Sequence, residues 1–305
     1  MARVLIESVP NISEGRRPTV VDAVAQAAEG EGCWLVDASC DADHNRAVIT
    51  LVGNPEGLEQ GVLRLVAAAV ERIDLREHQG AHPRMGAVDV IPFIPVSGAT
   101  MEACVALSQA VGRKIAERFA LPVLLYEESA SAPHRRNLAA VRKGGFEGLA
   151  DKLADSRWTP DFGPPAPHPS AGAVAVGARE FLIAFNINLA SGDLDVAKRV
   201  AAAVRHSSGG LRYVKALGLA LERGTVQVSM NLTNYRKTPI LRVLELVERE
   251  ASRYGVAISD CEIVGKIPRG ALYDVAAQAL HIHGFDPSVV LEGRIDDVLG
   301  GRSRP

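Results

Sequence analysis

The sequence predicts an α+β fold of two halves, each with the element order β-α-β-β-α-β. Three observations support this prediction. Short apolar runs and helix-spaced apolar residues follow one another in the same order in both halves. Gly and Pro residues stand where these segments end. Short similar segments also recur: an Asn-Ile pair lies near the first expected strand of each half (Asn11, Asn186), and an Ile-Pro pair near the fourth (Pro95, Pro268).

The first half contains four expected strands, at residues 4–6, 33–37, 46–52 and 88–94. Each is an apolar run bounded by polar or turn-forming residues. The first expected helix begins at Pro18 and runs to Ala28, because Pro suits the first helical turn and Gly30 ends the pattern. The second covers residues 57–72 and follows the turn at residues 53–55.

The second half repeats these elements in the same order. Strands are expected at residues 181–188, 214–221, 225–231 and 261–264. Helices are expected at residues 194–205 and 239–254. This order is the split arrangement of ferredoxin-like folds, in which the helices cover one face of an antiparallel sheet. The second face of each sheet stays open, so we expect two sheets whose open faces stack or border a cleft for a flat ligand.

The halves are joined by a segment with a helix at residues 101–119, a strand-like run at 122–126 and a Pro-rich stretch at 158–172. The Pro-rich stretch is the best candidate for the boundary. We expect an N-terminal subdomain within residues 1–178 and a C-terminal subdomain within residues 179–305.

The composition gives the protein almost no net charge that could attract a charged polymer. The 34 Lys and Arg residues stand against 36 Asp and Glu residues, so the formal charge is -2 and neither nucleic acid nor an anionic membrane is an expected partner. No run of about 18 apolar residues occurs, and Glu7 interrupts the first apolar run, so we expect no signal peptide. We therefore expect a soluble protein of the cytoplasm.

A loop before the fourth strand has the densest group of polar residues. It contains His78, His82 and Arg84, and Gly80 and Pro83 exclude a regular helix there. An imidazole held between Gly and Pro suits proton transfer in both directions at neutral pH. The alternative is a histidine that only satisfies backbone groups in a turn.

A second polar group lies between the second and third strands, where Asp37, Asp41, Asp43, His44, Asn45 and Arg46 fall within one short hairpin. An Asp- and Asn-rich turn explains part of this pattern, because such side chains bond to their own backbone. It does not explain Arg46, which is suited to binding a carboxylate through two parallel hydrogen bonds.

A metal site is the main rival, because these Asp and His residues are possible ligands. No His-Glu-x-x-His motif occurs, and the loop keeps His78 and His82 off one helical face, so we expect no metal. A phosphate loop is also excluded: residues 172–177 have its glycine spacing, but Arg179 stands where the motif requires Ser or Thr after a Lys.

Several longer segments together resemble the glutamate formiminotransferase family. They are residues 7–15, 82–95, 160–164 and 177–188, and the resemblance runs to about Leu272. It implies two ferredoxin-like subdomains whose antiparallel sheets face a shared folate cleft, a homodimer, and tetrahydrofolate as co-substrate. It also implies that His82 is the catalytic residue.

The resemblance assigns further site residues. The acid that supports His82 is Asp37 or Asp41, because Ser39 stands where mammalian members have an acid. Residues expected to bind substrate carboxylates are Asn11, Asn45, Arg46, Arg84, Asn186 and Asn188. The folate segment corresponds to Gly163, Pro164, Pro165, Ala166, Pro167, His168, Pro169, Ser170, Ala171 and Gly172.

The implied reaction transfers a formimino group from N-formimino-L-glutamate to N5 of tetrahydrofolate, a step of one-carbon metabolism and histidine degradation. Two alternatives use the same cleft: a folate-binding protein without catalysis, and a transferase acting on 5-formyltetrahydrofolate. A metal-dependent hydrolase is the third.

Overall fold

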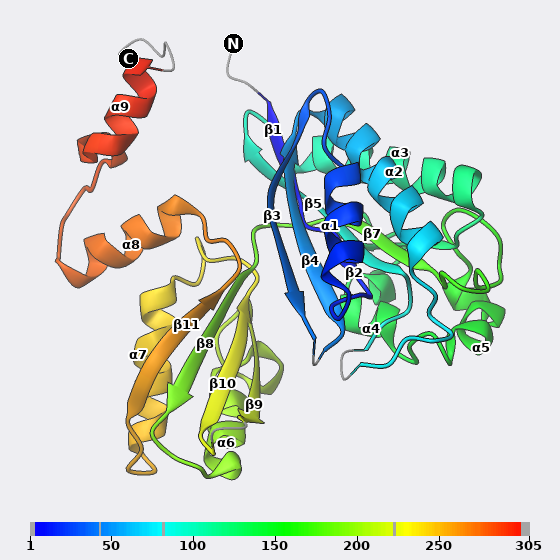
Figure 1. Cartoon of the computed structure of the whole chain (residues 1–305). Helices are drawn as coiled ribbons and strands as arrows, with labels where there is room; N and C mark the ends of the chain where they lie inside the picture. The colour runs from blue at the N-terminus through cyan, green and yellow to red at the C-terminus, as the bar shows by residue number, and fades with distance from the viewer. Residues whose placement is uncertain (1–3, 43, 81–82, 222–223, 300–305) are drawn as a thin grey trace. The chain divides into compact units, whose positions relative to one another are not determined.

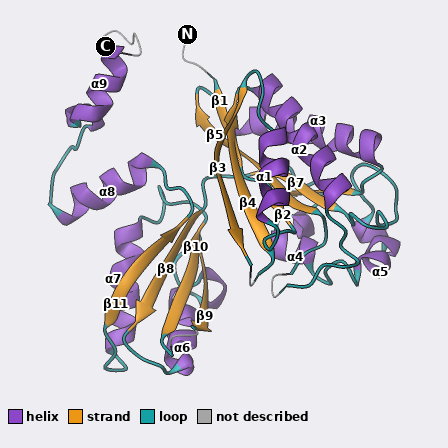
Figure 2. Cartoon of the chain, viewed as in Figure 1, coloured by secondary structure: helices purple, strands orange, loops and turns teal. Residues whose placement is uncertain are grey.

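The computed structural model describes residues 4–42, 44–80, 83–221 and 224–299, and it divides into two compact units (Figure 1). The first unit spans residues 1–180 and the second residues 181–305. Each unit contains its own sheet and its own hydrophobic core. The mixed α+β class expected from the sequence is confirmed in both (Figure 2).

The first sheet contains a ferredoxin-like set of strands, in the spatial order β3, β4, β1 with β2, and β5. Pro10 separates β1 from β2, and both short strands pair with β4 and β5. The bounds are β1 Leu5–Ser8, β2 Asn11–Ile12, β3 Cys33–Asp41, β4 Arg46–Gly53 and β5 Val88–Ser97.

Two further strands, β6 (Val123–Glu127) and β7 (Val174–Ala178), extend this sheet beyond β5. β7 pairs in parallel with both β5 and β6. The expectation of an antiparallel sheet is therefore wrong for this part of the first unit, whose sheet is mixed. Residues 172–177, which only resembled a phosphate loop, thus supply a buried strand. Parallel strands covered on both faces are continuous apolar runs, and β7 fits this rule.

Three long helices cover one face of the first sheet: α1 (Pro18–Ala27), α2 (Pro55–Arg72) and α3 (Met101–Phe119). α2 begins where the Asn54 side chain accepts a hydrogen bond from the Gly57 N–H at 2.7 Å. Their buried side chains pack on Ile6, Leu51 and Phe93 of the sheet.

Two short helices cover part of the other face, at β6, β7 and Val90 of β5. They are α4 (Leu138–Arg142) and α5 (Leu149–Ala154), whose Val141, Leu149 and Leu153 pack on Leu124 and Tyr126 of β6. The sequence analysis did not predict them, since each is too short to show a helical period. Single-turn helices η1 (Pro133–Arg135) and η2 (Ser156–Trp158) flank them.

The Pro-rich stretch belongs to the first unit and does not form the boundary. Val123 of β6 donates to the Phe162 carbonyl at 2.9 Å, and Asp161 donates to the Val123 carbonyl at 2.8 Å. β7, which follows the stretch, lies inside the first sheet. The chain therefore crosses between units after Glu180.

The second unit is an antiparallel sheet in the order β11-β8-β10-β9, as expected for the ferredoxin-like arrangement. The strands are β8 Ile183–Leu189, β9 Val214–Ala220, β10 Val226–Leu232 and β11 Ile258–Val264. Ile187 and its apolar neighbours on β8 face α6 (Leu194–Val204) and α7 (Ile240–Ser252). Asn186 and Asn188 therefore project from the opposite face.

The chain ends in two helices that the sequence analysis did not predict, α8 (Arg269–Ala279) and α9 (Leu291–Leu299). Single-turn helices η3 (His206–Ser208) and η4 (Pro287–Val289) complete the unit. None of the helices among the described residues combines the length and apolar character needed to cross a bilayer.

Candidate functional site

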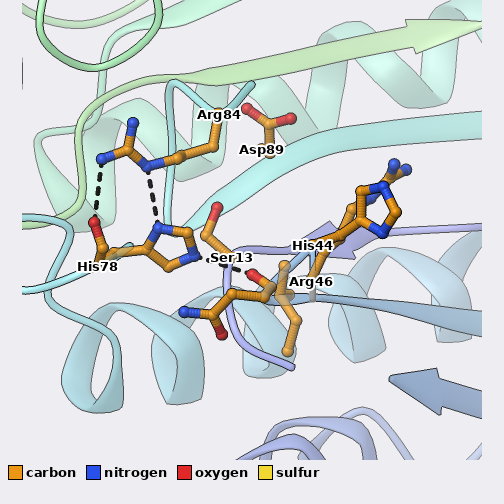
Figure 3. Close-up of a pocket in the computed structure, with 8 residues that line it drawn as sticks. Ser13, His44, Arg46, His78, Arg84 and Asp89 are labelled. Carbon is orange, nitrogen blue, oxygen red and sulfur yellow. Dashed lines mark hydrogen bonds between the residues drawn. The ribbon is translucent and has the colours of Figure 1, made fainter. Parts of the chain in front are cut away.

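The two polar segments noticed in the sequence meet at a small hollow of the first unit (Figure 3). One is the hairpin between β3 and β4, and the other is the loop between α2 and β5. The hollow has an empty volume of about 180 Å³, part of it open to solvent, and is lined by Ile12, Ser13, His44, Asn45, Arg46, His78, Arg84 and Asp89.

Asn45 joins the two segments. Its side chain donates to the Gln79 carbonyl at 2.9 Å and accepts from the Gly15 N–H at 2.9 Å, while its own carbonyl accepts from His78 Nε2 at 2.8 Å. Its φ is 48°, a left-handed conformation that Asn tolerates better than most residues. Gly80 allows the contact, because a Cβ there would lie 2.4 Å from the His44 carbonyl oxygen. Asn45 is thus a structural junction of the hollow.

The imidazole of His78 is held through both nitrogens. Nε2 lies 2.8 Å from a carbonyl oxygen, which can only accept, so Nε2 carries the proton. Nδ1 accepts from Nε of Arg84 at 3.0 Å. This pattern describes a neutral imidazole in one tautomer. Neither nitrogen is available to exchange a proton with a substrate while these bonds persist.

Arg84 is also committed to partners within the protein. Its two terminal nitrogens donate to Glu147 at 2.8 and 3.0 Å, and Nη2 donates to the His78 carbonyl at 3.2 Å. The hydrogen bond from Arg84 is the largest cause that holds the pKa of Glu147 below its usual value. A substrate carboxylate at Arg84 would have to share the guanidinium with Glu147 or displace it.

The innermost charged group is Asp89, on β5. Its side chain is 4% exposed, and burial raises its pKa despite the nearby Arg142 guanidinium at 2.6 Å and the Met85 N–H at 2.7 Å. Burial and the like charge of Arg142 lower the pKa of Arg46 to about 10, against the opposing effects of Asp89 and Asp41. Arg46 therefore remains a cation at neutral pH. The hollow thus combines the buried carboxylate of Asp89 with the half-buried guanidinium of Arg46.

Asp89 and Arg142 were not among the site residues expected from the sequence. Asp89 carried a signal, since it is the one charged residue in the apolar run 88–94. Arg142 carried none, because nothing local shows that α4 packs beside β5.

The two acids proposed to support His82 lie on the same strand. Asp41, at the end of β3, is opposite Arg46, and its carboxylate accepts from the His44 N–H at 2.9 Å and lies 2.7 Å from His44 Nδ1. Asp37 lies four residues earlier, opposite Thr50, which is about 13 Å along a strand. Asp41 is therefore the acid beside the hollow.

His82 and its neighbour Ala81 lie outside the described residues, and so does Asp43 of the hairpin. The proposed role of His82 therefore stays a prediction. The described residues on either side are Gly80 and Pro83.

The expected folate segment, residues 163–172, is fixed at both ends to the first unit. His168 and Gly172 pair through both backbone groups, and Ser170 accepts from the Leu75 N–H at 2.8 Å. Ala171 accepts from the Ala87 N–H at 3.0 Å, so this end lies against the loop that carries His78 and Arg84.

The other end of this segment is anchored by a buried ion pair. Arg135 lies 2.8 Å from Asp161 and also donates to the carbonyls of Arg157 and Thr159. The side chains of Arg135 and Asp161 are 7% and 9% exposed. Removing one partner of such a pair leaves an uncompensated buried charge, so we regard it as a structural anchor.

The other three asparagines expected to bind substrate carboxylates form hydrogen bonds within the protein. Asn11 of β2 is buried and donates to the Val9 carbonyl at 2.8 Å. On the second unit, Asn188 donates to Asp260 at 2.6 Å and accepts from Gln227 at 2.9 Å, while Asn186 lies 3.4 Å from Glu262. Asn186 and Asn188 thus have polar partners within the sheet of the second unit.

A larger hollow shares Ser13, Asn45 and His78 with the first one. It encloses about 890 Å³, part of it open to solvent, and its further lining comes mainly from charged residues near the start of α1 and the end of α2. Within the described parts of the chain, no three His, Cys, Asp or Glu side chains are grouped so that they could hold a metal ion.

Comparisons with known proteins identify the family of the chain. The family model described as "Formiminotransferase domain, N-terminal subdomain" matches residues 5–179, and the one described as "Formiminotransferase domain" matches residues 184–286. The chain is 46% identical over 288 residues to the glutamate formimidoyltransferase of Streptococcus pyogenes serotype M1, with 94% of this chain and 96% of that protein covered.

Two more relatives match over most of this chain. The glutamate formimidoyltransferase of Thermoplasma acidophilum is 44% identical over 296 residues, which is 96% of this chain and 97% of that protein. The formimidoyltransferase-cyclodeaminase of Sus scrofa is 44% identical over 281 residues, which is 90% of this chain but 52% of that protein.

Proposed function

The chain belongs to the formiminotransferase family, and we propose that it transfers the formimino group of N-formimino-L-glutamate to N5 of tetrahydrofolate. The products are 5-formiminotetrahydrofolate and L-glutamate. The observation that carries this proposal is the identity of 44–46% to two glutamate formimidoyltransferases over nearly their whole length.

The transfer requires two proton movements. N5 of tetrahydrofolate attacks the formimino carbon, forms a C–N bond and gives a tetrahedral intermediate. N5 then loses a proton, the bond to the glutamate nitrogen breaks, and that nitrogen gains a proton so that it leaves as an amine. One imidazole that accepts and then donates meets both needs, and such catalysis contributes roughly 10²–10⁴-fold. We assign this role to His82.

His78 does not compete for this role, because both of its ring nitrogens are already bonded. Of the two acids, Asp41 is the better support for His82, since it lies beside His44 at the edge of the hollow. Asp37 is farther along the strand and remains the alternative.

Charged substrate groups would be bound at the hollow. We assign a substrate carboxylate to Arg46, a half-buried cation that lines the hollow together with Asn45 and Arg84. Asn11, which directly precedes the lining residue Ile12, is assigned to the same role. The folate would lie along residues 163–172, whose end packs against the same loop. We also assign Asn186 and Asn188, on the second unit, to substrate binding. We further propose a cytoplasmic homodimer that uses tetrahydrofolate as co-substrate and no metal.

An assay with N-formiminoglutamate and tetrahydrofolate tests the proposal. Wild type should turn over, and His82→Ala should lose about 10²-fold or more in kcat while binding folate normally. His206→Ala, which changes an exposed histidine of the second unit, is the control and should keep full activity. Folate binding without turnover would instead indicate a binding protein, turnover only with 5-formyltetrahydrofolate a different donor, and loss of activity in EDTA with recovery in zinc a metal-dependent hydrolase.

A further inference from the structure

We infer that Arg142, which does not line the hollow, is a positioning residue that holds residues 83–85 in place beside it. This inference rests on the proposed function only for its kinetic consequence. The guanidinium of Arg142 lies 2.6 Å from Asp89, and its Nη2 also donates to the carbonyl of Pro83. Arg142 therefore joins strand β5 to the residue that directly follows His82 in the sequence.

Asp89 completes this connection from the other side. Its second carboxylate oxygen accepts from the Met85 N–H at 2.7 Å, so Pro83 and Met85 are both bonded to the one buried Arg142–Asp89 pair. The two side chains are 15% and 4% exposed, so the pair is little screened by solvent. This pair fixes both ends of a three-residue segment.

Residues 146 and 147, shortly after Arg142, bond to Arg84, which lies between Pro83 and Met85. Phe146 donates to the Arg84 carbonyl at 2.8 Å, and Glu147 pairs with the Arg84 side chain. Glu147 is 67% exposed, and exposed ion pairs contribute little, whereas breaking a buried pair leaves a charge without compensation. We therefore expect Arg142, and not Glu147, to control the position of this segment.

Nη2 of Arg142 makes both contacts, so one end of the rigid guanidinium lies between Asp89 and Pro83. The planar guanidinium presents several donors in a fixed geometry, whereas the ammonium of Lys is a point charge on a flexible stem. Proton transfer depends on reacting atoms being placed to within about 1 Å. A loosened segment should thus lower kcat more than it weakens substrate binding.

The test uses the full chain with three variants: Arg142→Met, Arg142→Lys and, as a matched control, Lys143→Met, which changes an exposed neighbour. We expect Arg142→Met to lower kcat about tenfold or more with KM for both substrates within about threefold, and Arg142→Lys to fall between it and wild type. Added guanidinium ion should restore part of the activity of Arg142→Met, and Lys143→Met should match wild type.

A second measurement does not need activity. Hydrogen exchange of the Met85 amide should be faster in Arg142→Met and Arg142→Lys than in wild type, because its acceptor Asp89 loses its partner. An unchanged Met85 exchange rate, or wild-type kcat in either Arg142 variant, would overturn the inference. If wild type itself shows no transfer, the proposed function fails, and the Met85 exchange rate alone decides this inference. If Arg142→Met does not fold, Arg142→Lys decides it on the same two measurements.

Discussion

The polar residues of the candidate site separate into groups that hold the backbone and groups that face the hollow. His78 belongs to the first kind, because its ring links the Asn45 carbonyl to the Arg84 guanidinium. Glu14 does the same at the start of α1: one oxygen accepts from the N–H groups of Arg16 and Arg17, both at 2.9 Å. Ionisable type alone therefore does not identify a catalytic group.

His78→Phe tests the linking role. The ring is similar in shape, but the Asn45 carbonyl and Arg84 Nε lose their partners, so we expect the free energy of unfolding to fall by about 1–3 kcal/mol. Both tryptophans, Trp34 and Trp158, lie in the first unit, so tryptophan fluorescence in urea reports this unit. His206→Phe, a control at an exposed position of the second unit, should not change the urea midpoint of that transition. An unchanged midpoint in His78→Phe would contradict the linking role.

Glu14→Gln tests the pH dependence of stability. Burial raises the pKa of Glu14, but hydrogen bonds from Arg17 and Arg16 outweigh it and hold the folded-state pKa below the ordinary 4.5. A lowered acid pKa adds stability that is complete above the unfolded-state value and is lost as pH falls through the folded-state value. We expect Glu14→Gln to cost about 1–2 kcal/mol at pH 7 and progressively less below pH 4.5.

Urea unfolding at a series of pH values provides the measurement. Glu31→Gln, at an exposed position, is the control and should follow wild type at each pH within about 0.5 kcal/mol. A cost for Glu14→Gln that stays constant down to pH 3 would show that Glu14 does not act through its charge.

At the level of elements, glycines let the loop before β5 approach two other segments closely. These are the hairpin between β3 and β4 and the end of residues 163–172. Gly86 and Gly172 pair as an isolated β-bridge, and a Cβ at Gly172 would lie 2.1 Å from the Met85 carbonyl oxygen. No side chain fits between these two backbones. The end of residues 163–172, the segment proposed to bind folate, is thereby held against the loop before β5.

Gly172→Ala tests this packing against a matched glycine. Gly172 and Gly255 have φ values of 67° and 69°, but a Cβ at Gly255 would meet nothing within 4 Å. Gly255→Ala should cost roughly 1 kcal/mol for the left-handed backbone alone, and Gly172→Ala about 1–3 kcal/mol more. Urea unfolding followed by circular dichroism measures both. Equal costs would mean that the close approach does not constrain the segment.

At the level of the whole molecule, the two units are built as separate hydrophobic bodies. The first has cores on both faces of its extended sheet, and the second has one core between its sheet and α6 and α7. No buried cluster among the described residues contains side chains from both units. Each unit therefore has what a domain needs to fold alone.

Residues 1–180 produced alone should thus fold. We expect one cooperative urea transition by tryptophan fluorescence, coincident with that by circular dichroism, because the fragment keeps both of its cores. The same fragment carrying Leu51→Ala should unfold at lower urea, since Leu51 is fully buried in the larger core. A gradual transition without a defined midpoint would contradict independent folding of the first unit.

Local patterns in the sequence were enough to predict the main helices and strands. The helix at residues 101–119 matches α3 at both ends, and the β-α-β-β-α-β order holds in both units. The long helices and alternating strands have periods set by their own side chains. Elements that depend on distant partners were missed: α4 and α5 are too short to show a period, and β7 is a strand because β5 and β6 lie beside it.

For the site, the sequence alone identified the family and the two polar segments, because motif residues and their spacing lie close together along the chain. The hydrogen bonds that join His78 to Asn45, and the ion pair of Arg142 with Asp89, connect residues far apart in sequence. Such pairs exist only because folding brings separate backbones within hydrogen-bonding distance, and no local spacing encodes that distance. The tertiary structure was therefore needed to distinguish His78, whose ring nitrogens are both bonded, from a histidine free to move protons.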